Sequence, residues 1–437
     1  MAKILIQGGI VLTLSNNSPH WQHDDVLVDG DRIVAIGNEI EDEEALRIDA
    51  TGCVVMPGLV NAHLHCWQTP LRGIAADWTL QDYLVRILGE IGPRFSPEDI
   101  YWSTLAAALD QIDAGVTTVV DWSHNAPTPA HADAALAALR DAGIRAVFLR
   151  GAFTSALDDA TAANGGWTDI DIPSGANGLL RLGMSILGPA YSLLDTVRSE
   201  LRRGAERNEV VSMHFSGPPA SDAFRRLAGE GLITPKVNIV HGNGIDEEEL
   251  RALIDSGATF TVTPEIEMQM GFSAVITGRL LAAGVRPSLG VDSETASSSE
   301  MLQVVRFAMQ LQRYMDHQSA RQDTGAPMAA VSVRARDALR WATVEGTHAA
   351  GLGAEVGTLA PGKFADIILV RVREVYSGLD PAQFVVSRAT TSDIDTVMIS
   401  GQLRKIAGKR LGAASIKVED RLSEISRRVL LTETITS

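Results

Sequence analysis

The feature that most constrains the fold of this chain is a regular alternation of short β-rich runs and Ala/Leu-rich helical stretches between about residues 57 and 350. Such alternation is typical of βα units that build a parallel sheet. Eight consecutive βα units predict an α/β fold with a closed (β/α)₈ barrel. We expect its strands at 54–63, 117–122, 145–151, 181–187, 210–215, 237–241, 259–264 and 287–292.

Both ends of the chain have a different sequence pattern, in which short β-rich runs are separated by turns. Asp29-Gly30 stands between two such runs and predicts a tight turn, and Gln7-Gly8-Gly9 predicts a further hairpin. We expect residues 1–56 and 356–410 to join into one small β-sandwich domain built from both chain ends. Residues 57–355 would form the barrel, and residues 411–437 a C-terminal helix and tail.

The composition limits the partners that a chain like this can have. Its 437 residues contain 38 Lys and Arg against 54 Asp and Glu, which gives a net charge of −16. This balance disfavours a nucleic-acid groove or an anionic membrane surface, and no apolar run is long enough to predict a membrane span. Two cysteines and no signal-peptide pattern favour the cytoplasm. We expect a small-molecule substrate and leave homo-oligomerisation open.

Several expected strands end in residue types that bind metal ions, and barrel enzymes place their chemistry at those ends. His63 and His65 end the first strand, His214 the fifth and Asp292 the eighth. Two histidines at alternate strand positions point to one face, where both rings can bind the same cation. A structural role is the simpler interpretation for any single histidine. The whole set at strand ends nevertheless predicts a catalytic metal site of the zinc type.

Short motifs surround these residues and continue to about residue 400. They are Met56-Pro57-Gly58-Leu59-Val60-Asn61-Ala62-His63-Leu64-His65, Val240-His241-Gly242, Leu289-Gly290-Val291-Asp292-Ser293 and a return strand within 357–367. Together with His214 they resemble the amidohydrolase superfamily. The most similar branch is that of the cytosine/guanine deaminases and chlorotriazine hydrolases, whose members hydrolyse C–N or C–halogen bonds of nitrogen heterocycles with one metal ion.

The resemblance implies roles for the residues at the strand ends. His63, His65, His214 and Asp292 correspond to the metal ligands of that branch, and Asp292 also to the base that takes a proton from water. His241 corresponds to the histidine that contacts the attacking water or polarises the substrate. Leu187-Gly188-Pro189 follows the fourth strand, so the lysine of a dinuclear centre is missing. We therefore expect one divalent ion per chain, with Zn²⁺ preferred and Fe²⁺ as the alternative.

One departure from the branch concerns proton transfer. Its members carry a glutamate three residues after the histidine of the fifth strand, but this chain has His214-Phe215-Ser216-Gly217. Either Asp292 and His241 transfer the proton alone, or another carboxylate replaces the missing one. Glu265 and Glu267 follow the seventh strand, and we predict an acid–base role for Glu265. A solvated loop carboxylate is the alternative.

Four further residues are predicted to contact the substrate. Gln68 resembles the amide that binds substrate in heterocycle deaminases, and Trp67 is expected to wall an aromatic pocket. His124 and Tyr191 follow the ends of other strands. Substrate identity is expected to depend on the loops 66–94 and 152–177.

These observations predict a metal-dependent hydrolase that deaminates a nitrogen heterocycle with metal-activated water. An amide or urea hydrolase and a dehalogenase are the alternatives on the same scaffold. A non-catalytic, metal-stabilised scaffold is the alternative from another class, and the missing glutamate is the fact in its favour.

Overall fold

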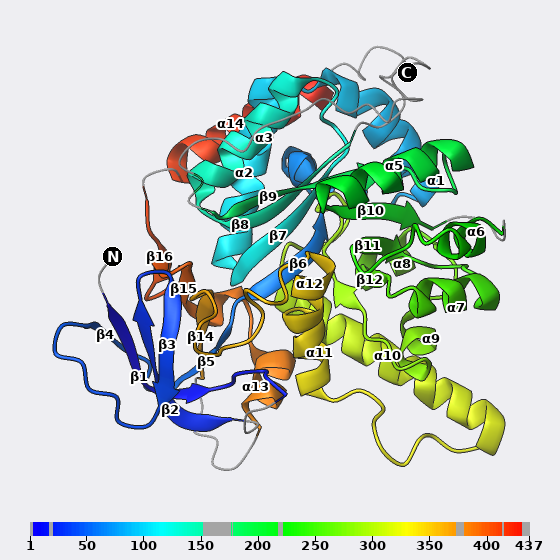
Figure 1. Ribbon diagram of the computed structural model, residues 1–437. Coiled ribbons are helices and arrows are strands. Elements are labelled where there is room, and N and C mark those ends of the chain that lie inside the picture. The colour runs from blue at the N-terminus through cyan, green and yellow to red at the C-terminus, as the bar shows by residue number, and fades with distance from the viewer. Residues whose placement is uncertain are drawn as a thin grey trace.

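A barrel of eight parallel strands lies at the centre of the molecule (Figure 1). The computed structural model describes residues 3–16, 21–151, 176, 178–216, 222–372, 380–412 and 415–430. Each strand pairs with the next one along the chain, so the predicted (β/α)₈ barrel is confirmed. The strands are β6 (Leu59–Leu64), β7 (Val116–Ser123), β8 (Arg145–Arg150), β9 (Leu180–Ile186), β10 (Val210–Phe215), β11 (Val237–His241), β12 (Thr259–Val262) and β13 (Ser288–Leu289).

The barrel closes between β13 and β6. A parallel bridge links Leu64 to Asp292, and the amides of Asp292 and His65 donate to the carbonyls of His63 and Asp292, both at 2.9 Å. Gly290 permits this approach, because a Cβ atom there would lie 2.7 Å from the Cβ of His63. Closure of the barrel therefore brings Asp292 against the two histidines of the first strand.

The first strand differs from the expectation. The prediction of a single strand over 54–63 is wrong, because this segment forms two strands that belong to two sheets. β5 (Cys53–Pro57) lies in the smaller sheet and β6 in the barrel. Gly58 separates them at a point where a Cβ atom would lie 2.1 Å from the side chain of Thr117. The residues of both strands are buried, so their hydrophobic pattern does not show where the chain passes from one sheet to the other; the backbone pairing does.

Strands from both ends of the chain form one nine-stranded sheet beside the barrel. The Asp29-Gly30 turn is confirmed, but the hairpin at Gln7–Gly9 is wrong: that segment is one strand with a bulge, and Gly8 has a φ of +76°. The domain boundaries at 1–56, 356–410, 57–355 and 411–437 stay a prediction. The strands besides β5 are β1 (Ile4–Val11), β2 (Gln22–Asp29), β3 (Arg32–Gly37), β4 (Leu46–Asp49), β14 (Ile367–Arg371), β15 (Ile394–Ile399), β16 (Gln402–Ile406) and β17 (Lys409–Arg410).

Helices surround the barrel, and their ends follow capping rules. The Ser96 and Asp99 side chains form a capping box at the start of α2 (Pro97–Asp113), and Asp246 caps α7 (Glu247–Asp255), which has three glutamates in its first turn. The C-terminal helix α14 (Ser415–Leu430) packs on α2, as Figure 1 shows in red. The surrounding helices include α2 (Pro97–Asp113), α3 (Pro129–Ala142), α5 (Leu194–Arg207), α6 (Ala223–Gly229), α7 (Glu247–Asp255), α9 (Thr277–Ala282), α10 (Met301–Thr324), α11 (Ala335–Trp341) and α12 (Val344–Ala349).

Shorter helices follow the carboxyl ends of β6 and β12, where the site lies. They are η1 (Cys66–Leu71), α1 (Leu80–Tyr83), the π-helical turn η2 (Leu84–Ile91), η3 (Gly92–Arg94) and α8 (Pro264–Gln269). The remaining helices, α13 (Pro381–Arg388) and η5 (Thr391–Asp393), lie between β14 and β15 in the chain.

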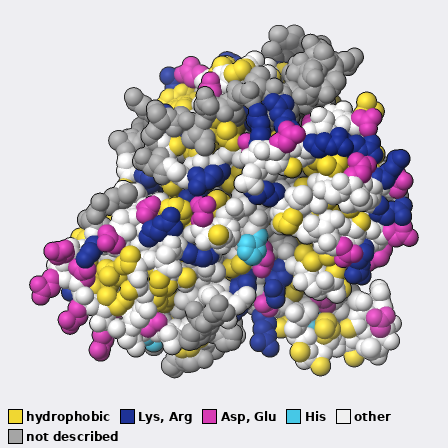
Figure 2. All heavy atoms as spheres, in the orientation of Figure 1, with side chains coloured by type: hydrophobic (Ala, Val, Ile, Leu, Met, Phe, Trp, Pro, Cys, Tyr) yellow, Lys and Arg dark blue, Asp and Glu magenta, His cyan; other side chains and the backbone are white. Residues whose placement is uncertain are grey.

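The surface carries both signs of charge. Figure 2 shows Lys and Arg side chains interspersed with Asp and Glu over one face, and hydrophobic side chains that gather over the nine-stranded sheet. None of the described helices combines the length and the apolar character needed to cross a membrane.

Candidate metal centre and active site

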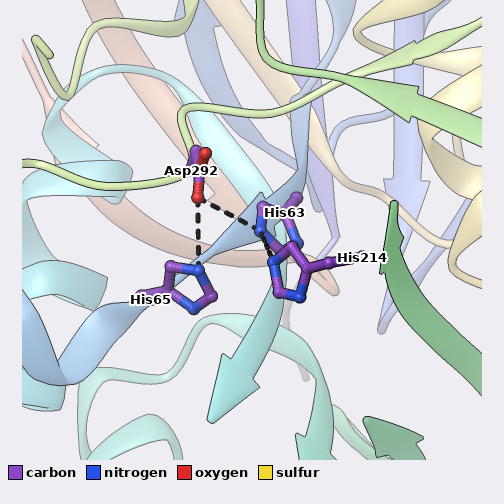
Figure 3. A group of neighbouring side chains, drawn as sticks. All are labelled: His63, His65, His214 and Asp292. Carbon is purple, nitrogen blue, oxygen red and sulfur yellow. Dashed lines mark hydrogen bonds and ion pairs between the residues drawn. The ribbon is translucent and has the colours of Figure 1, made fainter. Parts of the chain in front are cut away.

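Four side chains from three strand ends converge at one end of the barrel (Figure 3). His63 lies in β6 and His65 directly follows its last residue, Leu64, so their rings share a face, as the alternate spacing predicts. His214 comes from β10 and Asp292 from the segment that closes the barrel after β13. Their candidate ligand atoms all lie within 4.8 Å of one another.

The shortest distances in this group join ring nitrogens to a carboxylate and to each other. The Nε2 atoms of His63 and His65 lie 3.3 and 3.2 Å from Asp292 Oδ1, and the Nε2 atoms of His63 and His214 are 3.1 Å apart. Donor atoms that share one ion through bonds of about 2.0–2.2 Å have separations of this size. Three imidazole nitrogens and one carboxylate oxygen are also the donor set that suits such an ion.

Burial keeps the imidazoles in the form that binds metal. Desolvation lowers the pKa of His63 to about 4 and that of His214 well below its ordinary value. His65 Nδ1 donates to the Trp122 carbonyl at 2.8 Å, which leaves its Nε2 lone pair free on the side of the cluster. Burial opposes the charge of Asp292, but the adjacent His63 and His65 rings hold its pKa well below the usual range. The residues therefore fit a divalent cation.

His241, at the end of β11, lies beside this cluster. Its Nε2 is 3.8 Å from Asp292 Oδ2, the oxygen that does not face His63 and His65. On its other side, Nδ1 lies 3.1 Å from Thr263 Oγ1 and 3.4 Å from Glu267 Oε1. The Thr263 hydroxyl also donates to Asp292 Oδ2 at 3.3 Å. A carboxylate on Nδ1 favours a proton there, so Nε2 is the nitrogen left to act toward the cavity.

Two of these residues have a strained backbone. His241 and Asp292 have φ values of 68° and 69°, in the left-handed region that non-glycine residues rarely occupy. Each costs of order 1 kcal/mol and persists only where the surroundings enforce it, which is common at functional sites. Both residues leave their strands at this point, and the turn aims their side chains at the same space.

A cavity of about 190 Å³ opens over the cluster. His65, His214, His241 and Asp292 line one part of it. Its other lining is mostly apolar and comes from the carboxyl ends of six of the strands and the segments that follow them. Those residues are Leu80, Tyr83, Leu84, Leu88, Trp122, His124, Leu187, Tyr191, Ser216, Ile266, Met270, Phe272 and Ser293. An apolar cavity with a few convergent polar groups is the usual form of a small-molecule site.

Comparison with known proteins agrees with this architecture. Residues 54–404 match the amidohydrolase family. The chain belongs to the amidohydrolase family. The prediction of an amidohydrolase-type hydrolase is thereby confirmed.

Two relatives of this amidohydrolase are bacterial deaminases. It is 28% identical to a 5-methylthioadenosine/S-adenosylhomocysteine deaminase of Pelotomaculum thermopropionicum, over 98% of this chain and 99% of the relative. It is also 28% identical to the protein of that name from Carboxydothermus hydrogenoformans, over 95% and 96% of the two chains.

Solved structures share the fold at lower sequence identity. The atrazine chlorohydrolase of Arthrobacter aurescens in complex with zinc superposes with a TM-score of 0.81 at 23% identity, over 97% of this chain and 100% of that one. An adenosine deaminase from Xanthomonas campestris with bound zinc gives 0.80 at 21% identity, over 98% of each chain.

In this amidohydrolase, the four residues predicted to contact the substrate lie at different distances from the cavity. His124 and Tyr191 line the cavity, and Tyr191 Oη lies 3.1 Å from Ser216 Oγ. Gln68 lies behind the lining: its amide donates to Tyr83 Oη at 2.7 Å and accepts from Ser293 Oγ at 2.6 Å. Trp67 lies beside His124, with its Nε1 3.4 Å from His124 Nδ1.

The two glutamates after β12 point in different directions. Glu265 accepts a hydrogen bond from Gln303 at 3.1 Å and is not among the described residues that line the cavity. Burial raises its pKa. Glu267, two positions later on α8, is fully buried and faces His241. Its Oε2 has no hydrogen-bond partner among the described residues. The role predicted for Glu265 gains no supporting contact and stays a prediction.

Sequence reasoning missed Thr263, Tyr83 and Ser293. Thr263 links His241 to Asp292, and the other two line the cavity. Ser293 directly follows a predicted ligand and could have been found from that position. Tyr83 lies within the predicted substrate loop 66–94, which carries no signal that singles it out. Gly217 and the loop segment 152–175 lie outside the described residues.

Proposed function

We propose that this amidohydrolase is a metal-dependent deaminase that hydrolyses a C–N bond of a nitrogen heterocycle. The observation that carries the proposal is the convergence of three imidazoles and one carboxylate at a largely apolar cavity. The names of the relatives, both deaminases of adenosine-type compounds, support the choice of leaving group and ring.

One divalent ion per chain would be held by His63, His65, His214 and Asp292. The donor set suits Zn²⁺, with Fe²⁺ as the alternative, and two structural neighbours were solved with zinc. When bound, the ion would supply Lewis acidity that lowers the pKa of a water molecule toward about 7.

The two oxygens of Asp292 would have separate tasks. Oδ1 faces His63 and His65, whereas Oδ2 faces Thr263 and the Nε2 atom of His241. In the proposed step, the attacking water loses a proton to Asp292 Oδ2. The proton then passes to the departing nitrogen as the C–N bond breaks. His241 Nε2, which carries no proton when Nδ1 does, would accept a hydrogen bond from the attacking water and so orient it. Glu267 would act through His241, because its carboxylate holds the Nδ1 proton and so fixes the orientation of the ring.

A hydrolase for a leaving group other than an amine is the second candidate. The observation in its favour is the sequence His214-Phe215-Ser216-Gly217, which lacks the glutamate that protonates a departing nitrogen in similar enzymes. A halide needs no such proton, and a structural neighbour is named as a chlorohydrolase. The cytoplasmic location, the small-molecule substrate as sole partner and the open oligomeric state stay predictions.

A panel of heterocycles that differ in leaving group tests this proposal. Zinc-loaded enzyme would be incubated with amino-, alkylamino- and chloro-substituted purines, pyrimidines and triazines, and ammonia, amine and chloride would be measured separately. We expect ammonia from at least one amino compound, with loss of activity in the Asp292→Asn variant. Chloride release alone would favour the second candidate, and no product from any compound would contradict the proposal.

A further inference from the structure

The cavity above the metal centre is lined on two sides by aliphatic and aromatic side chains. Leu80, Leu84 and Leu88 are spaced four residues apart on α1 and η2, so they share one face of this helical segment. Ile266, Met270 and Phe272 line the cavity from α8 and the residues after it. Any part of a substrate that extends away from the metal centre therefore meets apolar side chains.

Positive charge is missing from the loops that follow the barrel strands. After β7, β9, β11, β12 and β13, the sequence up to the next helix contains no Lys or Arg, and none occurs in the sequence between β8 and β9 or between β10 and α6. Only the loop after β6 contains arginines, which are Arg72, Arg86 and Arg94. An anionic substrate would have to find its partner among these three.

Each of the three arginines is engaged elsewhere. Arg72 pairs with Glu294 at 2.8 Å and with Asp110 at 2.6 Å. The Arg86 guanidinium lies over the ring of Trp78, 4.9 Å from its centre. Arg94 donates to the carbonyl of Val429 at 2.6 Å. None of them is among the described residues that line the cavity.

Away from the metal centre, a carboxylate or phosphate in this space would meet hydroxyl groups such as those of Tyr191 and Ser216, but no Lys or Arg among the described lining residues. Burial of a charge without an ionic partner is unfavourable. From the apolar walls and the missing cations we infer that the substrate is uncharged, with an apolar substituent away from the bond that is cleaved. This inference rests on the proposed function and narrows it to one class of heterocycle.

The inference separates the two compounds that appear in the relatives' name. 5-Methylthioadenosine ends in an uncharged methylthio group, whereas S-adenosylhomocysteine ends in an amino acid with a carboxylate and an ammonium group. A compound of the first kind suits the cavity and one of the second kind does not. The relatives' name therefore does not transfer to this chain as a whole.

The test uses two probes with side chains of similar length and different charge. Adenine with a propyl group on its imidazole nitrogen and adenine with a carboxyethyl group there would be bound to the zinc-loaded enzyme in a calorimeter. Ammonia release would be measured in parallel. We expect the propyl compound to bind at least about 100-fold more tightly, which corresponds to about 2.7 kcal/mol. Equal affinity, tighter binding of the carboxylate, or binding of neither probe would overturn the inference. Binding preference without ammonia would instead contradict only the proposed function.

A matched pair of arginine variants gives an independent check. Leu84 lines the cavity and is only half-buried, so an arginine there can keep its charged end near the mouth. Val85 is the next residue on the same helix, is 47% exposed and does not line the cavity. We expect Leu84→Arg to improve binding of the carboxyethyl probe at least about tenfold, and Val85→Arg to leave both probes unchanged. Equal effects of the two substitutions would overturn the inference.

Discussion

Two groups of buried charged side chains lie at opposite ends of the barrel, and they differ in how completely their polar atoms are paired. At the amino end of β8, Arg145 binds Asp366 through two hydrogen bonds of 2.7 and 3.0 Å. Asp366 also accepts from the amide of Ser400, and the ring of Phe364 lies 4.5 Å from the guanidinium. Every charge in this group is matched by a partner.

The group at the carboxyl ends of the strands is incompletely matched. Within the described part of the chain, His63 Nδ1 and Glu267 Oε2 have no hydrogen-bond partner. Neutral ring nitrogens of His63 and His214 face each other at 3.1 Å. Buried polar groups without partners are costly, and a functional site is one place where a protein keeps them. The two groups thus differ in hydrogen bonding: the polar atoms are fully paired in the structural group and incompletely paired in the candidate functional group.

The largest effect on stability is expected at the matched group. Arg145→Met leaves Asp366 buried without its partner and should lower the free energy of unfolding by about 3–5 kcal/mol. The double variant Arg145→Met, Asp366→Leu should recover much of this loss, because neither charge remains. Urea denaturation measures both changes. A loss in the single variant below about 1 kcal/mol would show that pairing does not stabilise this end of the barrel.

The next effect concerns the partner of His241. Glu267→Gln should lower kcat by about 100-fold with little change in KM or in metal content, because the variant keeps the shape but not the charge that orients His241. Glu265→Gln serves as the control on the same helix, and its carboxylate contacts Gln303 instead. We expect less than about a threefold change there. A large loss of kcat in Glu265→Gln with little loss in Glu267→Gln would support the role predicted for Glu265 and contradict the role proposed for Glu267.

The separation of Glu265 from Glu267 also shows how far the sequence could be interpreted. Both follow the same strand, and chain position alone cannot distinguish them. A short helix starts at Pro264 and turns the two side chains in different directions. Which of the two faces His241 depends on the orientation of that helix, and this orientation depends on tertiary packing.

The convergence of the four candidate metal ligands was predictable for a physical reason. Alternate histidines on one strand share a face, and parallel strands of a barrel end on the same side, so local patterns were sufficient to bring His63, His65, His214 and Asp292 together. Gln68 shows the limit of the same reasoning. It follows the ligands closely in sequence, yet η1 turns its amide toward Tyr83 and Ser293 behind the cavity.

A smaller effect on stability, which depends on pH, is expected at Asp121. Its carboxylate is buried on β7, has one oxygen without a partner among the described residues and does not line the cavity. Burial raises its pKa from 3.8 to about 7. The unfolded chain therefore loses this proton at a lower pH than the folded chain, so stability falls as the pH rises between the two values.

Replacement of Asp121 by asparagine should remove this pH dependence. The stability difference between Asp121→Asn and wild type should shift in favour of the variant by roughly 2 kcal/mol between about pH 5 and pH 7.5. Asp255→Asn at the exposed end of α7 is the control, and it should show no such trend. A difference that is constant with pH would show that the Asp121 carboxyl is solvated normally.

The central claim is that the incompletely matched group is a site for one metal ion. Metal content of the purified protein, and of chelator-treated protein reloaded with Zn²⁺, tests it most directly. We predict about one ion per chain in the wild type and none in His214→Ala, whose ring is the most accessible of the four ligands. Urea denaturation of His214→Ala should match that of the metal-free wild type, which shows that the fold persists. A wild-type protein that binds no ion, or a His214→Ala variant that binds as much as the wild type, would contradict the account.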